Sequence, residues 1–416
     1  MKDTTLKDTT LYDDLLGLKH PWYVAGVRLD VVKQEVEVEV RSKDTTWACP
    51  ECQGRMHIHE YTERRWRHLD RCQFKTILVS QVPRVQCSEH GTQVVQVPWA
   101  EKQGRCTKLF ERFAIAVLQE CAISAAIELL KISWDEADGI KQRAVKRGLE
   151  RKEEKICPQI GIDEKSYGKG NKFVTIVANI QEEATIVEHV GDGKGKDGLK
   201  DYWNKFGKEE LQAIEAIGME MSAAYRQSVI DNVPDALGKV VFDRFHIMQH
   251  VNESLNEVRR EEQKELSSMG NTILTGTRII WLYGEENVPE RYSNILGELK
   301  GKKLKTARGW ALKEAIRGLW KCSTEKEGQV FFEEWYSWAI RSRLEPVKKV
   351  ARMMKRHLPN IVSYFKHRIT NAALEGINNK IQSLIKKAYG YHNKDRFKND
   401  ILFHCGGLNL YPEVSQ

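Results

Sequence analysis

The chain has 416 residues, 41% of them hydrophobic, which is too long for one compact core and predicts several domains. Its 66 lysines and arginines outnumber its 58 acidic residues, and the net charge of +8 favours a polyanionic partner. The polar start of the chain does not resemble a secretory signal, and no apolar run reaches the roughly 18 residues that span a bilayer, so we expect a cytoplasmic protein without a membrane partner.

The first part of the chain is predicted to be rich in strands. Residues 1–45 are expected to form an N-terminal extension that leads into strands. The run Val24–Val31 and the strict alternation of Glu35–Val40 both have the period of two that half-buried strands show. A small β-rich unit is therefore expected to begin near Trp22.

Residues 46–98 contain two pairs of metal-ligand residues. Two residues separate Cys49 from Cys52, and two separate Cys87 from His90. Short turns of this kind direct two ligands towards one tetrahedral zinc ion, and nine cysteines without an export signal favour reduced thiols over disulfides. We therefore predict one structural zinc ion in a small zinc-ribbon-like β domain. Four intervening residues are alternative ligands: His57, His59, His68 and Cys72.

The same segment is basic and contains an aromatic residue. Arg64, Arg65 and Arg67 surround Trp66, so strands held by the zinc ion would display cationic groups. Such groups suit contacts with the DNA backbone. The alternative is a solvated strand face that is basic without binding DNA.

Residues 99–152 change to a helical period and fit three short helices. Ser133 and Glu136 have the spacing of a capping box, which predicts that the last helix starts at Trp134. In a helix-turn-helix of this kind the second helix enters the major groove of DNA. Its candidate DNA-binding residues are Lys141, Arg143, Lys146 and Arg147. The alternative is a three-helix packing unit without a DNA-binding role.

The chain from residue 157 to residue 265 is predicted to be an α/β core. Three strands come first, and helices then alternate with strands, which is the element order of a ribonuclease-H-like fold. After Asp243 nearly all of the chain has a helical pattern.

Four acidic residues have an order that suits metal-dependent chemistry. Asp163, Glu220 and Asp243 each stand on or at the end of a predicted core strand, and Glu375 lies on a late helix. Cleavage of a phosphodiester bond uses two divalent cations about 4 Å apart, and Mg²⁺ or Mn²⁺ binds the oxygens of converging carboxylates. The sequence therefore predicts a site for two such ions. His246 is a candidate to orient a phosphate or to protonate a leaving group, or it is a packed histidine bonded to Asp243.

Together these stretches resemble the ISL-three group of insertion-sequence transposases, and the similarity extends from about Trp47 to Leu410. The matching segments are the zinc-ligand pairs, the helix-turn-helix, Gly161–Glu164, Val241–His250, Thr370–Lys380 and Ala388–Tyr391. The group is of the DDE type, so the resemblance implies hydrolysis at transposon ends and attack of the freed 3′-hydroxyl on target DNA. It further implies double-stranded DNA as the partner, at least a homodimer on that DNA, and a nucleoid-associated place in a bacterial cytoplasm.

The resemblance matches Asp163 and Glu375 with the first and last catalytic acids. By strand order the middle acid is Glu220, at a position where relatives usually have Met-Asp-Met. Asp243 and His246 then match a separate acid-x-x-histidine motif, and a simpler interpretation makes Asp243 itself the middle acid. Because the longer glutamate side chain displaces the ligand oxygens, a catalytically impaired or domesticated DNA-binding protein is the alternative function.

The resemblance also implies an all-α insertion, residues 266–370, in the ribonuclease-H-like core, which residues 371–410 complete. The predicted fold is therefore multidomain: a zinc-ribbon-like β domain, a helix-turn-helix, and an α/β catalytic core interrupted by helices. The insertion contains a basic stretch that suits DNA phosphates, with Lys302, Lys303, Lys305 and Arg308. Trp310 and Trp320 are candidate aromatic wedges, and Trp281 is a candidate to stack on a flipped base; the alternative is that these tryptophans belong to the core.

Two other classes of protein share part of this pattern. A ribonuclease-H-like nuclease or resolvase would share the carboxylates, but it needs neither the zinc and helix-turn-helix segments nor a long helical insertion. A zinc-ribbon transcription factor would leave Asp163 and Glu375 unexplained.

Overall fold

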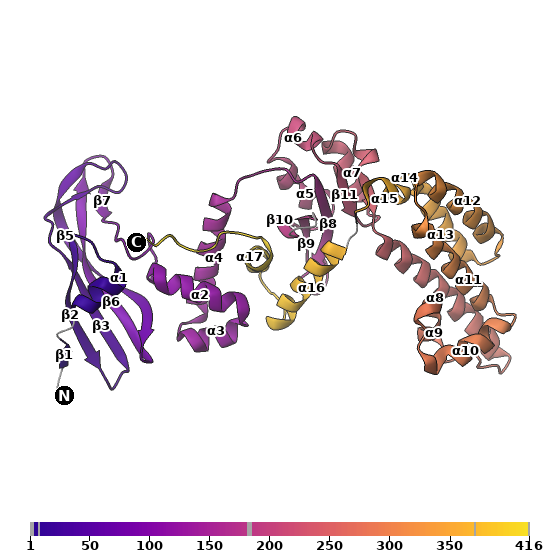
Figure 1. Ribbon diagram of the computed structural model, residues 1–416, viewed down its shortest axis with the longest axis horizontal. Coiled ribbons are helices and arrows are strands. Elements are labelled where there is room, and N and C mark those ends of the chain that lie inside the picture. Colours follow the sequence, from indigo (N-terminus) through magenta and orange to yellow (C-terminus); the bar gives the residue numbers. More distant parts are fainter. Residues whose placement is uncertain (1–3, 7–8, 181–184, 370–371, 415–416) are drawn as a thin grey trace. The chain divides into compact units, whose positions relative to one another are not determined.

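The computed structural model describes residues 4–6, 9–180, 185–369 and 372–414 (Figure 1). The chain divides into two compact units. The first comprises Met1–Lys152 and Leu408–Gln416, and the second comprises Glu153–Gly407. Among the described residues, no helix combines the length and apolar character needed to cross a bilayer. Thr370 and Asn371, which begin one of the segments that carry the family resemblance, lie outside the described residues.

A seven-stranded sheet dominates the first unit. Its strands are β1 (Thr4–Leu6), β2 (Trp22–Asp30), β3 (Glu35–Ser42), β4 (Thr46–Ala48), β5 (Arg55–Arg71), β6 (Phe74–Cys87) and β7 (Gly91–Val94). They follow the order β1-β2-β3-β6-β5-β4, and β7 also pairs with β6. Because β3 runs parallel to β6, the boundary predicted at residue 45 falls inside one continuous sheet.

The alternating sequence of β3 determines which of its side chains enter the core. Val36, Val38 and Val40 are buried, whereas the glutamates between them are half-buried. The valines pack with Leu78 of the parallel strand β6 in one apolar cluster. Burial of one such side chain stabilises the fold by about 1.5–3 kcal/mol. Side chains of a strand alternate between its two faces, so a strand buries all three valines on one side, and the period of two therefore favours a strand over a helix here. The predicted strand is therefore confirmed.

Three helices complete the folded part of the first unit that precedes Lys152. They are α2 (Lys108–Glu120), α3 (Ile123–Leu130) and α4 (Trp134–Arg151), while α1 (Thr9–Leu16) packs beside β2. Ser133 Oγ accepts a hydrogen bond from Glu136 N at 3.2 Å, and a Glu136 carboxylate oxygen accepts one from Ser133 N at 2.8 Å. The predicted capping box and the start of the last helix at Trp134 are confirmed.

The last described residues of the chain, 408–414, pack against α2 and α4. Gly148 permits this approach, because a Cβ there would lie 2.7 Å from Leu408 Cβ. Arg147 donates a hydrogen bond to Leu410 O, and Arg151 donates one to Tyr411 O at 2.7 Å. Residues 408–410, expected to complete the second unit's core, therefore belong to the first unit.

The second unit is built on a five-stranded sheet. Its strands are β8 (Gln159–Ser166), β9 (Phe173–Asn179), β10 (Ile186–Asp192), β11 (Ala216–Met219) and β12 (Val240–Phe242). The order is β10-β9-β8-β11-β12. β9 is antiparallel to both β8 and β10, whereas β11 is parallel to both β8 and β12.

Helices cover both faces of this sheet. One face packs against α5 (Lys196–Trp203), α7 (Ala223–Asn232) and α8 (Arg244–Ser268), and the short α6 (Lys208–Gln212) precedes β11. The other face packs against α16 (Ala372–Lys387) and α17 (Lys394–Cys405), which Figure 1 shows in yellow beside the strands. Alternate strand residues serve the two cores, so both faces are apolar.

A helical region extends from the end of β12. The 25-residue helix α8 leads into it, and α9 (Arg278–Leu282), α10 (Glu290–Gly301), α11 (Lys305–Ile316), α12 (Glu325–Arg341), α13 (Glu345–Arg356), α14 (Leu358–Val362) and α15 (Tyr364–His367) follow. The described residues from 266 to 369 contain no strand. Since α8 runs to Ser268, the insertion expected from residue 266 continues a helix that starts at the sheet.

Candidate active site and zinc site

Three carboxylates lie at one level of the second unit's sheet. Met219, the last residue of β11, pairs with the residue before Asp163 on β8 and with the residue before Asp243 at the end of β12. Glu220 follows Met219 and therefore stands between the two aspartates. Neighbouring strands are about 4.8 Å apart, so the row places Glu220 one strand from each aspartate and the aspartates two strands from each other.

Asp163 and Asp243 point towards the pocket on the face of the sheet that α16 covers. The residues that precede them, Ile162 and Phe242, belong to the opposite core beneath α5, α7 and α8. Successive side chains of a strand alternate between faces, so the two aspartates face α16, whereas Glu220 follows the end of β11 and lies outside the pocket lining. Gly161 allows α16 to approach β8 closely, because a Cβ there would collide with the side chain of Leu374. This approach brings Glu375 to the row.

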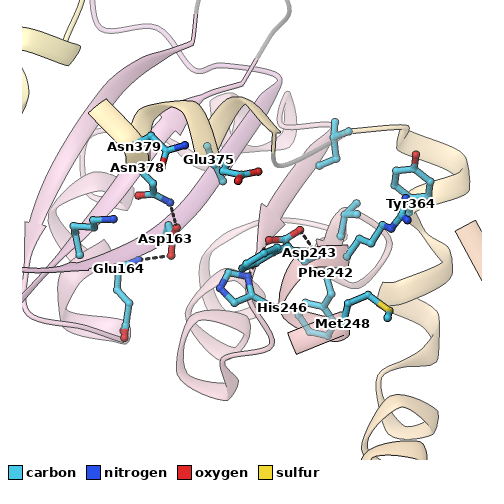
Figure 2. Close-up of a pocket in the computed structure, with 16 residues that line it drawn as sticks. Asp163, Glu164, Phe242, Asp243, His246, Met248, Tyr364, Glu375, Asn378 and Asn379 are labelled. Carbon is cyan, nitrogen blue, oxygen red and sulfur yellow. Dashed lines mark hydrogen bonds and ion pairs between the residues drawn. The ribbon is translucent and has the colours of Figure 1, made fainter. Parts of the chain in front are cut away.

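Asp163, Asp243 and Glu375 line a pocket of about 760 Å³. Figure 2 shows Glu375 projecting from α16, Asp163 on β8, and Asp243 with His246 at the start of α8. Glu220 stands beside the pocket and is not among its lining residues. Asp163, Asp243, His246 and Glu375, which the sequence predicted to act together, thus share one pocket.

Glu220 nevertheless shares the electrostatic environment of this pocket. Burial raises its pKa, and the charges of Glu164 and Asp163 raise the pKa further, whereas His246 opposes the shift. Like charges held close together disfavour ionisation, and a bound cation relieves that repulsion.

Both aspartates are held by hydrogen bonds. Asp163 Oδ1 accepts from Glu164 N at 2.8 Å, and Asp163 Oδ2 accepts from the side-chain amide of Asn378. Asp243 Oδ1 accepts from Phe245 N at 2.9 Å, which caps the start of α8. A carboxylate has about four acceptor positions, so each group retains capacity for a metal ion.

His246 is bonded to Asp243 and also lines the pocket. Its Nδ1 lies 2.9 Å from Asp243 Oδ2, and 29% of its side chain is exposed. The hydrogen bond with Asp243 raises the pKa of His246, and the charges of Asp163 and Glu220 act in the same direction against burial. The geometry therefore combines the two alternatives considered for this residue: it is packed against Asp243, and it faces the candidate site.

The donor set of the pocket suits hard divalent cations. Its carboxylate oxygens and Asn378 and Asn379 amides are the types of group that Mg²⁺ and Mn²⁺ prefer. Within the described part of the chain, only the cysteine and histidine group discussed next has three or more ligand side chains within 4.8 Å of one another. The pocket acids face each other across a wider space.

The four predicted zinc ligands meet at one end of the first unit's sheet. The ligand atoms of Cys49, Cys52, Cys87 and His90 all lie within 4.8 Å of one another. Cys52 Sγ is 3.7 Å from Cys87 Sγ, which is 3.5 Å from His90 Nδ1. Tetrahedral coordination with zinc–sulfur bonds near 2.3 Å requires sulfurs about 3.8 Å apart, so this group fits one zinc ion.

The alternative zinc ligands lie outside this group of four. His68 is buried, and its Nδ1 lies 2.9 Å from Thr107 Oγ1 at the start of α2. His57, His59 and Cys72 are exposed.

Only some of the predicted DNA-binding arginines of β5 are accessible. Arg64 is half-buried with its guanidinium over the Trp66 ring, and Arg65 is exposed but pairs with Glu37 at 2.8 Å. Arg67 is 5% exposed and donates to Leu130 O at 3.3 Å, which joins β5 to α3. The prediction of a DNA contact for Arg67 is corrected, because its guanidinium is buried and forms hydrogen bonds with groups of the protein itself.

The basic residues of α4 divide in the same way. Lys146 has 78% of its side chain exposed, whereas Lys141 and Arg147 are buried. Arg147 lies 2.6 Å from the carboxylate of buried Glu111, which also binds Arg143 at 2.7 Å. A buried carboxylate requires such partners, so the DNA contacts predicted for Lys141 and Arg147 are corrected and Lys146 is the accessible cation.

Two of the three predicted aromatic contacts of the insertion are also corrected, whereas Trp320 is half-buried with the guanidinium of Arg244 over its ring, and its contact stays a prediction. Trp281 is 1% exposed, and its Nε1 donates to Thr277 Oγ1 at 3.1 Å, so it cannot stack on a base. Trp310 is 3% exposed in the same apolar cluster. Lys313 is buried and donates to Tyr283 O at 2.6 Å. Of the four predicted basic residues, Lys302, Lys303 and Arg308 are exposed, whereas Lys305 pairs with Glu265 at 2.6 Å.

Sequence analysis overlooked several residues that line the pocket. Among them are Lys165, Phe245, Tyr364, Asn378 and Asn379. Asn378 follows Glu375 by three positions, a spacing that places both on one helix face, and that signal was available in the sequence. Burial lowers the pKa of Lys165, whereas the negative charge of Asp163 acts to raise it.

Comparisons with known proteins agree with this arrangement of a zinc site, three helices and an acidic pocket. A family model described as a transposase matches residues 160–401. Residues 45–90 match the zinc-finger of transposase IS204/IS1001/IS1096/IS1165, and residues 95–145 match the helix-turn-helix domain of transposase family ISL3. The class of protein is therefore a transposase with separate zinc and DNA-binding modules.

Individual relatives give the same result. The chain is 26% identical over 355 residues, 79% of each chain, to the transposase for insertion sequence element IS1557 of Mycobacterium tuberculosis. It is 22% identical over 354 residues, 84% of this chain and 86% of the relative, to the transposase for insertion sequence element IS1001 of Bordetella parapertussis. The chain belongs to the ISL3 family of insertion-sequence transposases, as the resemblance predicted.

Proposed function

We propose that this transposase cleaves phosphodiester bonds at the ends of its insertion sequence by two-metal catalysis and joins the freed 3′-hydroxyl ends to target DNA. The observation that carries the proposal is the meeting of Asp163, Asp243 and Glu375 in one pocket, with Glu220 between the two aspartates in the strand register. The sheet order β10-β9-β8-β11-β12, with three antiparallel strands followed by two parallel ones, supports a ribonuclease-H-like core of the DDE type.

We assign the metal ions to Asp163, Glu220 and Glu375. Asp163 and Glu220 stand at the ends of the adjacent strands β8 and β11, so both side chains would reach the same ions, which would activate the attacking oxygen and stabilise the leaving oxygen. Asp243 then holds His246, which orients the scissile phosphate or protonates the leaving group. The alternative assignment makes Asp243 the middle ligand, and its place in the pocket lining supports that alternative.

We further propose that double-stranded DNA contacts the accessible cations of both units. These are Arg64, Lys146, Lys302, Lys303 and Arg308, and one zinc ion at Cys49, Cys52, Cys87 and His90 stabilises the first unit. Two transposon ends must be cut together, so at least a homodimer assembles on DNA. Light scattering that finds one subunit per paired-end complex would contradict this.

The test is nicking of a labelled duplex that carries the element's own end, in Mg²⁺ or Mn²⁺. Cleavage should disappear in Asp163→Ala, Glu220→Ala and Glu375→Ala. Asp231→Ala is the control, because Asp231 is an exposed acid on α7 that pairs with Lys196. Loss in Asp243→Ala with activity retained in Glu220→Ala would move the middle ligand to Asp243.

A second candidate function is sequence-specific DNA binding without catalysis. The observation that favours it is Glu220, at a position where the family resemblance implies an aspartate. Specific binding of the transposon end without cleavage by the native chain, together with cleavage by Glu220→Asp, would establish a chain impaired at this residue.

A further inference from the structure

An exposed phenyl ring stands at the edge of the acidic pocket. Phe245 is 64% exposed and lines the pocket together with Asp163, Asp243 and Glu375. It is the second residue of α8, and its backbone N–H is held by Asp243 Oδ1. Its ring lies edge-on to His246, with ring centroids 5.7 Å apart and planes at 85°. The ring therefore adjoins His246 and lines the same pocket as the acids that the proposed function places at the scissile phosphate.

The exposure of this ring contrasts with several other large aromatic residues of the same unit, and the exposed Trp338 and Tyr389 lie outside the pocket lining. Trp281, Trp310 and Phe332 are each at most 3% exposed, in cores. Burial of a phenylalanine contributes about 1.5–3 kcal/mol, which the fold does not gain at Phe245. The pocket around the ring is lined by carboxylates, a histidine and amides together with apolar side chains such as Val241 and Leu374, so its surroundings suit a polar ligand with an aromatic face.

A nucleobase has that chemistry. Its flat face stacks on an aromatic side chain, whichever base it is, while its own phosphate reaches the neighbouring acids through their cations. We propose that Phe245 is a base-stacking residue, which holds one unstacked nucleobase beside the scissile phosphodiester. The inference rests on the proposed function, and it names the nucleobase beside the cut as the part of the DNA that the site binds. It also replaces Trp281, whose burial excludes such a contact.

The test pairs variants of Phe245 with changes in the DNA. Duplex ends carry an abasic nucleotide at each position that flanks the cut, and cleavage is compared for the native chain, Phe245→Ala, Phe245→Leu and Phe245→Trp. Stacking contributes about 1–3 kcal/mol per base, so Phe245→Ala should lower kcat/KM on the intact end by roughly 5- to 150-fold. Phe245→Leu should resemble Phe245→Ala, and Phe245→Trp should retain activity.

At one position, the abasic nucleotide should lower the kcat/KM of the native chain by the same factor. It should not lower the kcat/KM of Phe245→Ala any further. A second readout uses binding alone: in an Asp163→Ala background, 2-aminopurine at that position should leave the duplex stack for the ring and change its fluorescence on binding, and Phe245→Ala should abolish that change. Trp338→Ala is the matched control, because Trp338 is 49% exposed on α12 and is outside the pocket lining.

Unchanged cleavage by Phe245→Ala, or losses that add at every abasic position, would overturn the stacking role. A Phe245→Ala effect on self-association of the free protein would assign the ring to a contact between copies and also overturn it. Absence of cleavage by the native chain would instead refute the proposed function, and the 2-aminopurine measurement would still decide whether Phe245 stacks on a base.

Discussion

The side-chain amide of Asn378 donates a hydrogen bond to Asp163 Oδ2, which joins helix α16 to strand β8 across 215 residues of sequence (Figure 2). The bond uses one acceptor position of Asp163 Oδ2, and Glu164 N uses one of Asp163 Oδ1, so the remaining acceptor positions of the carboxylate are left for a cation. Because Asn378 and Glu375 share one face of α16, a single helix both orients Asp163 and contributes the last acid.

Asn378→Ala should weaken metal binding at the active site. Loss of a group that orients a metal ligand lowers metal affinity or activity by about 10- to 100-fold, so the Mg²⁺ concentration at half-maximal cleavage should rise by that factor. The measurement is cleavage rate against Mg²⁺ and against Mn²⁺ concentration. Gln382→Ala, an exposed change on the same helix, should leave the metal dependence unchanged. A loss of rate in Asn378→Ala that excess metal does not restore would contradict an orienting role.

Removal of the zinc ion should unfold part of the first unit. The purified chain should contain one zinc ion, and Cys87→Ser should lower that content and the unfolding temperature, because the ion joins the turn between β6 and β7, which holds Cys87, to the turn that holds Cys49 and Cys52. Metal analysis and thermal unfolding report the two effects. Cys72→Ser, an exposed cysteine outside the ligand group, is the matched control. Full zinc content in Cys87→Ser would exclude this site.

Replacement of two adjacent residues of α4 should affect two different properties, the stability of the first unit and its affinity for DNA. Arg147→Met leaves buried Glu111 without its closest partner and should destabilise the first unit by roughly 3–5 kcal/mol. Lys146→Met should leave stability unchanged and should reduce the slope of log DNA affinity against log salt by about one. Chemical denaturation and binding at several salt concentrations separate these effects. Equal stability of both variants would refute the structural role of Arg147.

Acidification should destabilise the first unit through His68. Burial lowers the pKa of His68 to about 4, from 6.5 for a solvated histidine. Below pH 6.5 the unfolded chain gains a proton that the folded chain does not, so stability is complete above pH 6.5 and falls as the pH decreases towards 4. The total loss is on the order of 3 kcal/mol.

His68→Gln should flatten this pH dependence between pH 6.5 and pH 5. Thermal unfolding of the zinc-loaded chain at several pH values measures it, with His57→Gln as the exposed control for acid effects on the zinc site. The same slope in His68→Gln and in the native chain would assign the acid sensitivity to other groups.

Patterns that depend on neighbouring residues were predictable from the sequence. The zinc-ligand pairs, the alternation in β3 and the capping box at Ser133 each involve positions at most a few residues apart, and backbone geometry alone relates such positions. The family resemblance added the order of the acids along the chain. The assignment of the middle acid stays a prediction, because Glu220 and Asp243 occupy the same row.

The tertiary structure decided which side chains are accessible and which distant residues meet. Lys146 and Arg147 are equivalent as sequence, but packing against Glu111 buries only the arginine, and a buried acid retains the cation that reaches it. Trp281 and Phe245 differ in the same way, one in a core and one at a pocket. Sequence by itself determined the local elements and the set of chemical groups, whereas the meeting of Asp163 with Asn378 required the close approach of α16 at Gly161, which long-range packing alone provides.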